Sequence, residues 1–136
     1  MKLDQARAKD FDALPLPGGV LNPNSLRIQP EAVKFVKAFF DAGKKVAAIC
    51  HSPWSIIEAG VVKGRRIASW PSLKTDLRNA GAEWVDEEVV VDGNLISSRK
   101  PADLPAFNCE MVGLFARRRP AGAIADRKEE LERRMM

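Results

Sequence analysis

The segment that most constrains the fold is residues 46–54, where a short apolar run ends in a cysteine and a helix start follows at once. Val46 to Ile49 are small or β-branched, which is typical of a strand covered on both faces. Ser52 is a residue type that caps helices, and Pro53 suits a first helical turn because its missing N–H would be unpaired there. We therefore expect Cys50 on a tight strand-to-helix turn, a nucleophile elbow in which the helix N-terminus favours a thiolate.

Length and composition limit the class of protein. A chain of 136 residues suffices for one domain with a buried core, and 46% apolar with 29% charged residues is typical of a folded globular protein. No apolar run is long enough to span a bilayer, and the N-terminus lacks the apolar stretch of a secretory signal. Two cysteines make no disulfide framework. We predict a cytoplasmic protein without membrane contact.

The net charge of +4 is concentrated near the C-terminus, in Arg117 to Arg119 and in the tail that follows. No aromatic or strand platform accompanies these charges, so we interpret them as a solvated tail rather than a nucleic-acid patch. The pairs Glu129–Arg133 and Glu130–Arg134 have the orientation that favours a helix. We therefore predict a charged C-terminal tail over 119–136 with a helix candidate in it.

The segments around the elbow alternate between strand and helix patterns, which is typical of a mostly parallel sheet between helix layers. We predict a disordered or frayed lead-in over 1–10 and one α/β domain over 11–118. Pro15 weakens the prediction of the first strand, because proline has no N–H group to donate to a sheet ladder. The expected strands are 11–17, 46–49, 66–70 and 84–85, followed by a hairpin near 88–98 with Asp92-Gly93 at its turn. The expected helices begin at residues 30, 53, 71 and 104. Residues 20–29 are expected to form a loop.

An ordered series of short segments carries a family resemblance over about residues 10–116. The segments are 12–14, 17–19, 46–51, 58–66, 79–86, 89–95, 98–101 and 103–107. On these residues the chain resembles the PfpI family, intracellular cysteine hydrolases and deglycases of the class I glutamine-amidotransferase-like superfamily. Such a series is a far more specific signal than a lone cysteine elbow.

The resemblance implies a flavodoxin-like three-layer sandwich with Cys50 as the nucleophile and His51 beside it. It implies an oxyanion hole formed by the backbone N–H groups of Gly19 and His51, where charge would develop near the thiol. Its substrates would be peptides or small carbonyl adducts, and its members assemble as dimers or larger homo-oligomers. The residues expected to support the site are Gly18, Asn24, Ser52 and Trp54.

We expect no cofactor. A zinc site is disfavoured because His51 is the only histidine and no further cysteine–histidine pair lies near Cys50.

Three departures from the family pattern bear on activity. The family domain begins with a strand–helix–strand unit whose glutamate hydrogen-bonds the cysteine, and the ten residues before the first predicted strand cannot supply it. We therefore expect an N-terminally truncated sandwich in which the strand beside the elbow strand is missing or borrowed. Asn24 stands where a carboxylate commonly reaches the histidine of a neighbouring subunit, and Ser52 stands where glycine or alanine is usual.

The leading hypothesis is a stress-related PfpI-like cysteine hydrolase, acting as a peptidase, deglycase or glyoxalase-like enzyme. The alternative is a catalytically impaired truncated paralogue that serves as a redox sensor or binding subunit.

The remaining candidates carry weaker signals. Cys50 has a rival interpretation as a small buried residue at a strand end, and Cys109 is expected to be inert packing on the last helix. Trp54 and Trp70 could form the wall of a pocket above the sheet, and core packing is nearly as well supported. The acids expected to be solvated surface are Glu58, Glu83, Asp86 and Glu87.

Overall fold

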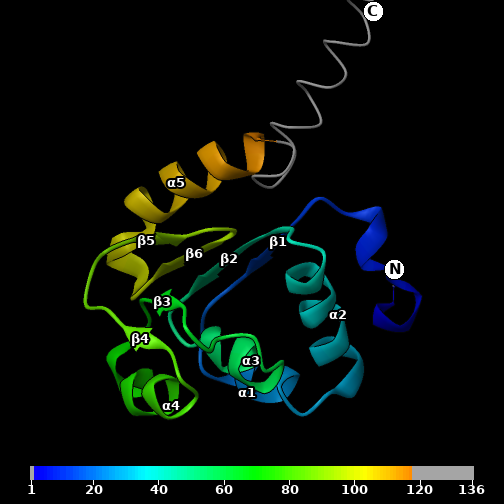
Figure 1. Cartoon of the computed structure of the whole chain (residues 1–136), viewed down its shortest axis with the longest axis horizontal. Coiled ribbons are helices and arrows are strands. Elements are labelled where there is room, and N and C mark those ends of the chain that lie inside the picture. The colour runs from blue at the N-terminus through cyan, green and yellow to red at the C-terminus, as the bar shows by residue number, and fades with distance from the viewer. Residues whose placement is uncertain (1, 118–136) are drawn as a thin grey trace, which may run out of the picture.

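The computed structural model describes residues 2–117, which form a four-stranded sheet with helices on both faces (Figure 1). The strand order is β1 (Ala13–Leu16), β2 (Lys45–Ile49), β6 (Leu95–Ser98) and β5 (Val90–Asp92). β1 and β6 both run parallel to β2, and β5 is antiparallel to β6. The predicted α/β fold with a mostly parallel sheet and a hairpin near 88–98 is confirmed.

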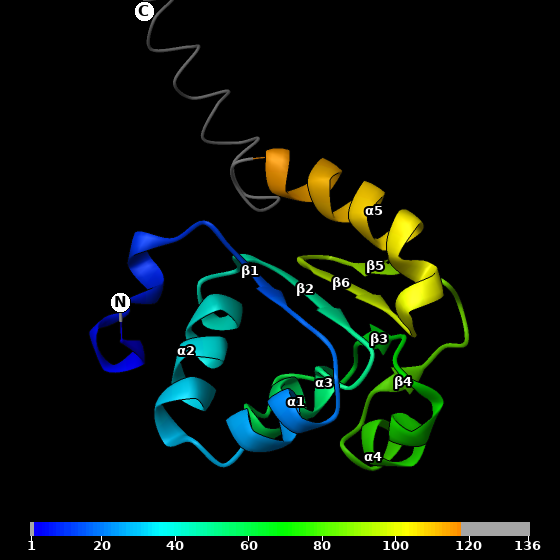
Figure 2. The ribbon, with the colours of Figure 1, turned by 180° about the vertical axis from the view of Figure 1, so that it is seen from behind.

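Helices lie on both faces of the sheet, as the two opposite views show (Figures 1 and 2). The first face carries α1 (Leu21–Leu26), α2 (Pro30–Asp41) and α3 (Pro53–Glu58), and the second carries α5 (Leu104–Ala116). This arrangement gives the three layers that the sequence predicts.

The elbow strand β2 is buried along its whole length, in agreement with its apolar sequence. Because successive side chains of a strand point to opposite faces, its residues divide between two cores. Val46 and Ala48 belong to the larger core beneath α2 and α3. Ala47 and Ile49 pack with Phe107 in the smaller core beneath α5. β2, which ends one residue before Cys50, is thus packed against a core on each of its two faces.

A second, two-stranded parallel sheet lies beside the first and consists of β3 (Arg66–Ile67) and β4 (Glu83–Trp84). The 3₁₀ turn η3 (Pro71–Leu73) and helix α4 (Lys74–Asn79) connect them. The strand predicted over 66–70 is shorter because the chain leaves the ladder after Ile67. Ala68 N–H donates to Ser97 Oγ, and Trp70 N–H donates to the carbonyl of Cys50.

The prediction that 20–29 is a loop is wrong, since residues 21–26 form helix α1. The sequence Asn22-Pro23-Asn24 favours turns, but Pro23 falls in the first helical turn, where its missing N–H has no helical partner to lose. The hairpin turn also differs by one position. Asp92 pairs with Leu95, so the two loop residues are Gly93 and Asn94, and Gly93 has a φ of 58°.

The predicted lead-in over 1–10 contains two 3₁₀ turns, η1 (Leu3–Gln5) and η2 (Ala8–Asp10). Lys44 Nζ donates to the carbonyls of Ala8 and Phe11 at 2.7 Å each, which ties this segment to the start of β2. The predicted tail over 119–136 lies outside the described residues. No helix within residues 2–117 is long and apolar enough to cross a membrane.

The expectation of a missing strand beside the elbow strand is wrong, because β2 is paired on both sides by β1 and β6. Among residues 2–117 the sheet ends at β1 instead. That edge position explains how Pro15 is accommodated, since edge strands tolerate a residue without an N–H donor.

An ion pair anchors the start of α5. Asp103 is only 3% exposed and accepts hydrogen bonds from Arg99 through the backbone N–H at 3.0 Å, Nε at 3.0 Å and Nη2 at 3.1 Å. Arg99 also donates to Asp86 at 2.8 Å. The hydrogen bonds from Arg99 hold the pKa of Asp103 below its ordinary value, and the same bonds raise the pKa of Arg99.

We predict that Asp103→Asn lowers the free energy of unfolding by about 1.5–3 kcal/mol at pH 7, because it removes the buried one of the two carboxylates that pair with Arg99. A lowered folded-state pKa contributes stability that is complete above the unfolded-state pKa and is lost as the pH falls through the folded-state value. The difference between wild type and variant, measured by urea denaturation, should therefore shrink as the pH falls from about 5 to about 3. A difference independent of pH would contradict this account.

Candidate active site

Cys50 occupies a strained turn between β2 and α3. Its φ is +65°, which makes it the one non-glycine residue with a positive φ between residues 2 and 117. Such a conformation costs about 1–3 kcal/mol and persists only where the surroundings enforce it. Two hydrogen bonds do so here: Cys50 N–H donates to the carbonyl of Ser98 at 3.1 Å, and the Cys50 carbonyl accepts from Trp70 N–H at 2.9 Å.

The turn closes without the cap that the sequence predicts at Ser52. Ser52 has φ −60° and ψ −24°, already helical, and its side chain makes no capping hydrogen bond. A capping side chain needs an extended backbone to reach the free N–H groups, so that prediction is wrong. The Ser52 N–H instead donates to the carbonyl of Ile49 at 3.1 Å, and Pro53 opens α3 as predicted.

The strained turn brings the two neighbouring side chains together. Cys50 Sγ lies 3.1 Å from His51 Nδ1, within reach of proton transfer. His51 is only 8% exposed and lies between two indole rings, with ring centroids 5.1 Å away at Trp54 and 5.9 Å away at Trp70. Burial lowers the pKa of His51, which keeps the imidazole neutral near pH 7 and able to accept a proton.

The Gly18-Gly19 loop passes directly against the thiol. A Cβ at Gly18 would lie 2.9 Å from Cys50 Cβ and 3.8 Å from Sγ, so no side chain fits there. Gly19 has a φ of +88°, a conformation that favours glycine. Within residues 2–117, neither the Gly19 N–H nor the His51 N–H donates a hydrogen bond. Both predicted oxyanion donors are thus unpaired in this part of the chain.

Asn24 is exposed on α1 and accepts a hydrogen bond from Arg27 Nη2 at 3.0 Å. The Arg27 guanidinium lies 4.5 Å from the centre of the Trp54 ring, and Trp54 packs against His51. Asn24 is therefore separated from His51 by the side chains of Arg27 and Trp54. The predicted contact between position 24 and the histidine of another subunit remains a prediction.

Two residues of this cluster have no signal in the sequence. Ser72 Oγ lies 3.5 Å from His51 Nε2, and Asp76 accepts a hydrogen bond from Trp54 Nε1 at 3.1 Å. Both follow the elbow by more than twenty positions, and neither belongs to a recognisable motif. Their contacts form only because the fold brings η3 and α4 next to the elbow.

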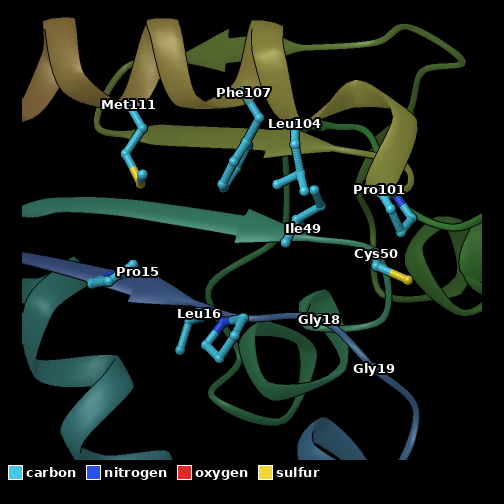
Figure 3. Close-up of a pocket in the computed structure, with 11 residues that line it drawn as sticks. Pro15, Leu16, Gly18, Gly19, Ile49, Cys50, Pro101, Leu104, Phe107 and Met111 are labelled. Carbon is cyan, nitrogen blue, oxygen red and sulfur yellow. The ribbon is translucent and has the colours of Figure 1, made fainter.

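A cavity of about 520 Å³ lies between β1, the end of β2 and α5 (Figure 3). Cys50 is at the end of this cavity next to Gly18 and Gly19, and the rest of the lining is apolar. The main side chains that line it are Pro15, Leu16, Ile49, Leu104, Phe107 and Met111. Trp54 and Trp70 are not among the lining residues; they pack around His51 instead.

The prediction of inert packing for Cys109 is wrong, because this cysteine is exposed. Phe107 and Met111 point from α5 toward the sheet, and a position two residues beyond Phe107 lies on the far side of a helix. Within residues 2–117, no group of three His, Cys, Asp or Glu side chains is arranged to hold a metal ion. The acids expected at the surface are all exposed, namely Glu58, Glu83, Asp86 and Glu87.

The fold and this site define an α/β protein with a cysteine at a strand-to-helix elbow. The family model described as the DJ-1/PfpI family matches residues 1–114, and the chain belongs to that family. The Pyrococcus horikoshii protein named Deglycase PH1704 is 50% identical over 115 residues, which covers 85% of this chain and 69% of that protein.

Solved structures give the same picture of the fold. A two-domain protein of Anabaena variabilis with a DJ-1/ThiJ/PfpI-like domain and a ferritin-like domain matches with a TM-score of 0.81 and 39% identity, over 84% of this chain and 34% of that one. Drosophila melanogaster DJ-1beta matches with a TM-score of 0.73 and 35% identity, over 80% of this chain and 59% of that one. The chain spans about two thirds or less of the length of each of these proteins.

We predict that Gly18→Ala lowers the free energy of unfolding by about 1–3 kcal/mol, since the new methyl group must displace Cys50 Cβ or the loop. It should also slow alkylation of Cys50. Gly113→Ala is the control, because nothing lies within 4 Å of a Cβ at that helical position. That variant should be neutral or stabilised by up to about 1 kcal/mol. Equal thermal melts for both variants would contradict the close approach at Gly18.

Proposed function

We propose that this chain is a cysteine-dependent hydrolase or deglycase, with Cys50 as its nucleophile and His51 as its base. The observation that carries the proposal is the 3.1 Å separation of Cys50 Sγ and His51 Nδ1 at a strained elbow. A thiol next to a neutral imidazole is the arrangement that activates a cysteine for attack on a carbonyl. The name of the Pyrococcus horikoshii relative, a deglycase, supports the same chemistry.

In the proposed reaction on a peptide, His51 Nδ1 takes the thiol proton as Cys50 Sγ bonds to the carbonyl carbon of the amide. The oxygen that becomes negative would accept hydrogen bonds from the N–H groups of Gly19 and His51, which are unpaired within residues 2–117. His51 then returns its proton to the leaving amine as the carbon–nitrogen bond breaks. Water hydrolyses the remaining thioester and restores the thiol.

A stress-related role in the cytoplasm and assembly into homo-oligomers follow from the resemblance to PfpI-like hydrolases. A neighbouring subunit would approach the site from the side of α1, where Asn24 and Arg27 lie next to Trp54. Asn24 can orient a partner's imidazole but adds no charge to stabilise its protonated form.

A second candidate is a redox sensor that uses the same thiol without turnover. Cys50 is partly exposed and adjacent to an imidazole, which suits reversible oxidation to a sulfenic acid. The lack of charge at Asn24 favours this alternative, because the imidazolium would then be stabilised less than by a carboxylate.

The proposal predicts cysteine-dependent consumption of methylglyoxal and of methylglyoxal-modified amines. Cys50→Ser should reduce turnover to the uncatalysed rate, and His51→Gln should reduce it by about 10²–10⁴-fold. Cys109→Ser is the matched control and should leave turnover unchanged, since Cys109 is exposed on α5, away from the elbow. Full turnover by Cys50→Ser would overturn the assignment. A wild type without turnover that forms a sulfenic acid in dilute peroxide would favour the sensor.

A further inference from the structure

The two ring nitrogens of His51 face different residues. Nδ1 is 3.1 Å from Cys50 Sγ, while Nε2 is 3.5 Å from the hydroxyl oxygen of Ser72. A neutral imidazole carries its proton on only one nitrogen, and the hydrogen bond made by the second nitrogen decides which one. The group at Nε2 therefore determines whether Nδ1 is free to act as a base.

Ser72 is held at this position by the fold. It lies in η3, two residues after Trp70, whose N–H donates to the Cys50 carbonyl at 2.9 Å. Leu73, on its other side, is fully buried in the main core, and its N–H donates to the carbonyl of Trp70. The short segment that carries Ser72 is thus fixed to the elbow at one end and to the core at the other.

We propose that Ser72 is a positioning residue for His51: its hydroxyl oxygen accepts the Nε2–H and so keeps Nδ1 available for the proton of Cys50. The inference rests on the proposed function of the same site. A separation of 3.5 Å is long for such a bond, but bonds to a catalytic group often tighten in the reacting state. When the imidazole is protonated, its charge strengthens the same hydrogen bond, and Ser72 then favours the thiolate–imidazolium pair.

No carboxylate takes this role among the groups packed around His51 in the described chain. The charged side chains that contact the Trp54 ring beside His51 are Arg27 of α1 and Asp76 of α4. Burial, not a neighbouring charge, is the cause of the lowered pKa of His51. A hydroxyl supports the imidazolium without adding charge, so the proposed site is built for moderate activation of its thiol.

The test measures the rate of Cys50 alkylation by iodoacetamide between pH 5 and pH 9. All proteins carry Cys109→Ser, because the exposed Cys109 would otherwise react as well. Ser72→Ala should lower the rate at pH 7 by about three- to tenfold and move the midpoint of the profile to higher pH. Ser72→Thr should restore both, and Ser72→Asp should move the midpoint below that of wild type. Thr75→Ala is the matched control, because Thr75 is exposed like Ser72 and lies one turn further along the chain. It should change neither the rate nor the midpoint.

A second readout uses the fact that His51 is the only histidine in the chain. In ¹⁵N-labelled protein the imidazole nitrogens give one set of signals, and their shifts report the tautomer. We expect the Nε2–H form in the Cys109→Ser protein and a mixture of both tautomers in Ser72→Ala. This measurement does not depend on any substrate, and thermal melts identify a variant that has failed to fold.

The outcomes separate the two claims. If Cys50 of the Cys109→Ser protein reacts as an ordinary thiol, the proposed function fails and Ser72 has no pair to position. If Cys50 is activated but Ser72→Ala leaves both the pH profile and the tautomer unchanged, only the role of Ser72 is overturned. A shifted profile that Ser72→Thr restores supports the positioning role, because a general loss of packing would not be repaired by a hydroxyl.

Discussion

The left-handed backbone at Cys50 is the constraint on which the rest of the site depends. With φ at +65°, the chain reverses at the end of β2, and the thiol and the next imidazole lie side by side, which neighbours in a regular strand or helix do not. The conformation is unfavourable for cysteine, so the fold must enforce it. A hydrogen bond from each side does this, one to Ser98 at the end of β6 and one from Trp70 beyond β3. The burial of β2 on both faces fixes the strand from which the turn departs.

The same constraint explains the sequence on the opposite side of the thiol. Because Cys50 projects from the turn toward the end of β1, the chain that passes there cannot carry a side chain at position 18. The glycine pair meets that steric demand and leaves the Gly19 N–H unpaired within the described residues. One turn therefore accounts for the positions of the proposed nucleophile, its proposed base and both proposed oxyanion donors.

The sequence predicted the α/β fold with a parallel sheet, and the elbow that brings the thiol and the imidazole together, because both depend on local patterns. The buried strand 46–49, the helix opening at Pro53 and the 92–95 hairpin all carry signals within a few residues. Helix α1 was missed because Asn22-Pro23-Asn24 has turn composition and is held by tertiary contacts with α3. Ser72 and Asp76 were missed because their contacts join segments about twenty residues apart.

The central claim is that the elbow holds a thiol, a base and two N–H donors around one reacting carbon. The most direct measurement is a crystal structure of the protein treated with a short peptide aldehyde, which forms a tetrahedral hemithioacetal with a reactive cysteine. The account predicts an adduct on Cys50 whose oxygen accepts hydrogen bonds from the Gly19 and His51 N–H groups, at about 2.7–3.1 Å. An adduct confined to the exposed Cys109, or one on Cys50 whose oxygen points to solvent, would contradict it.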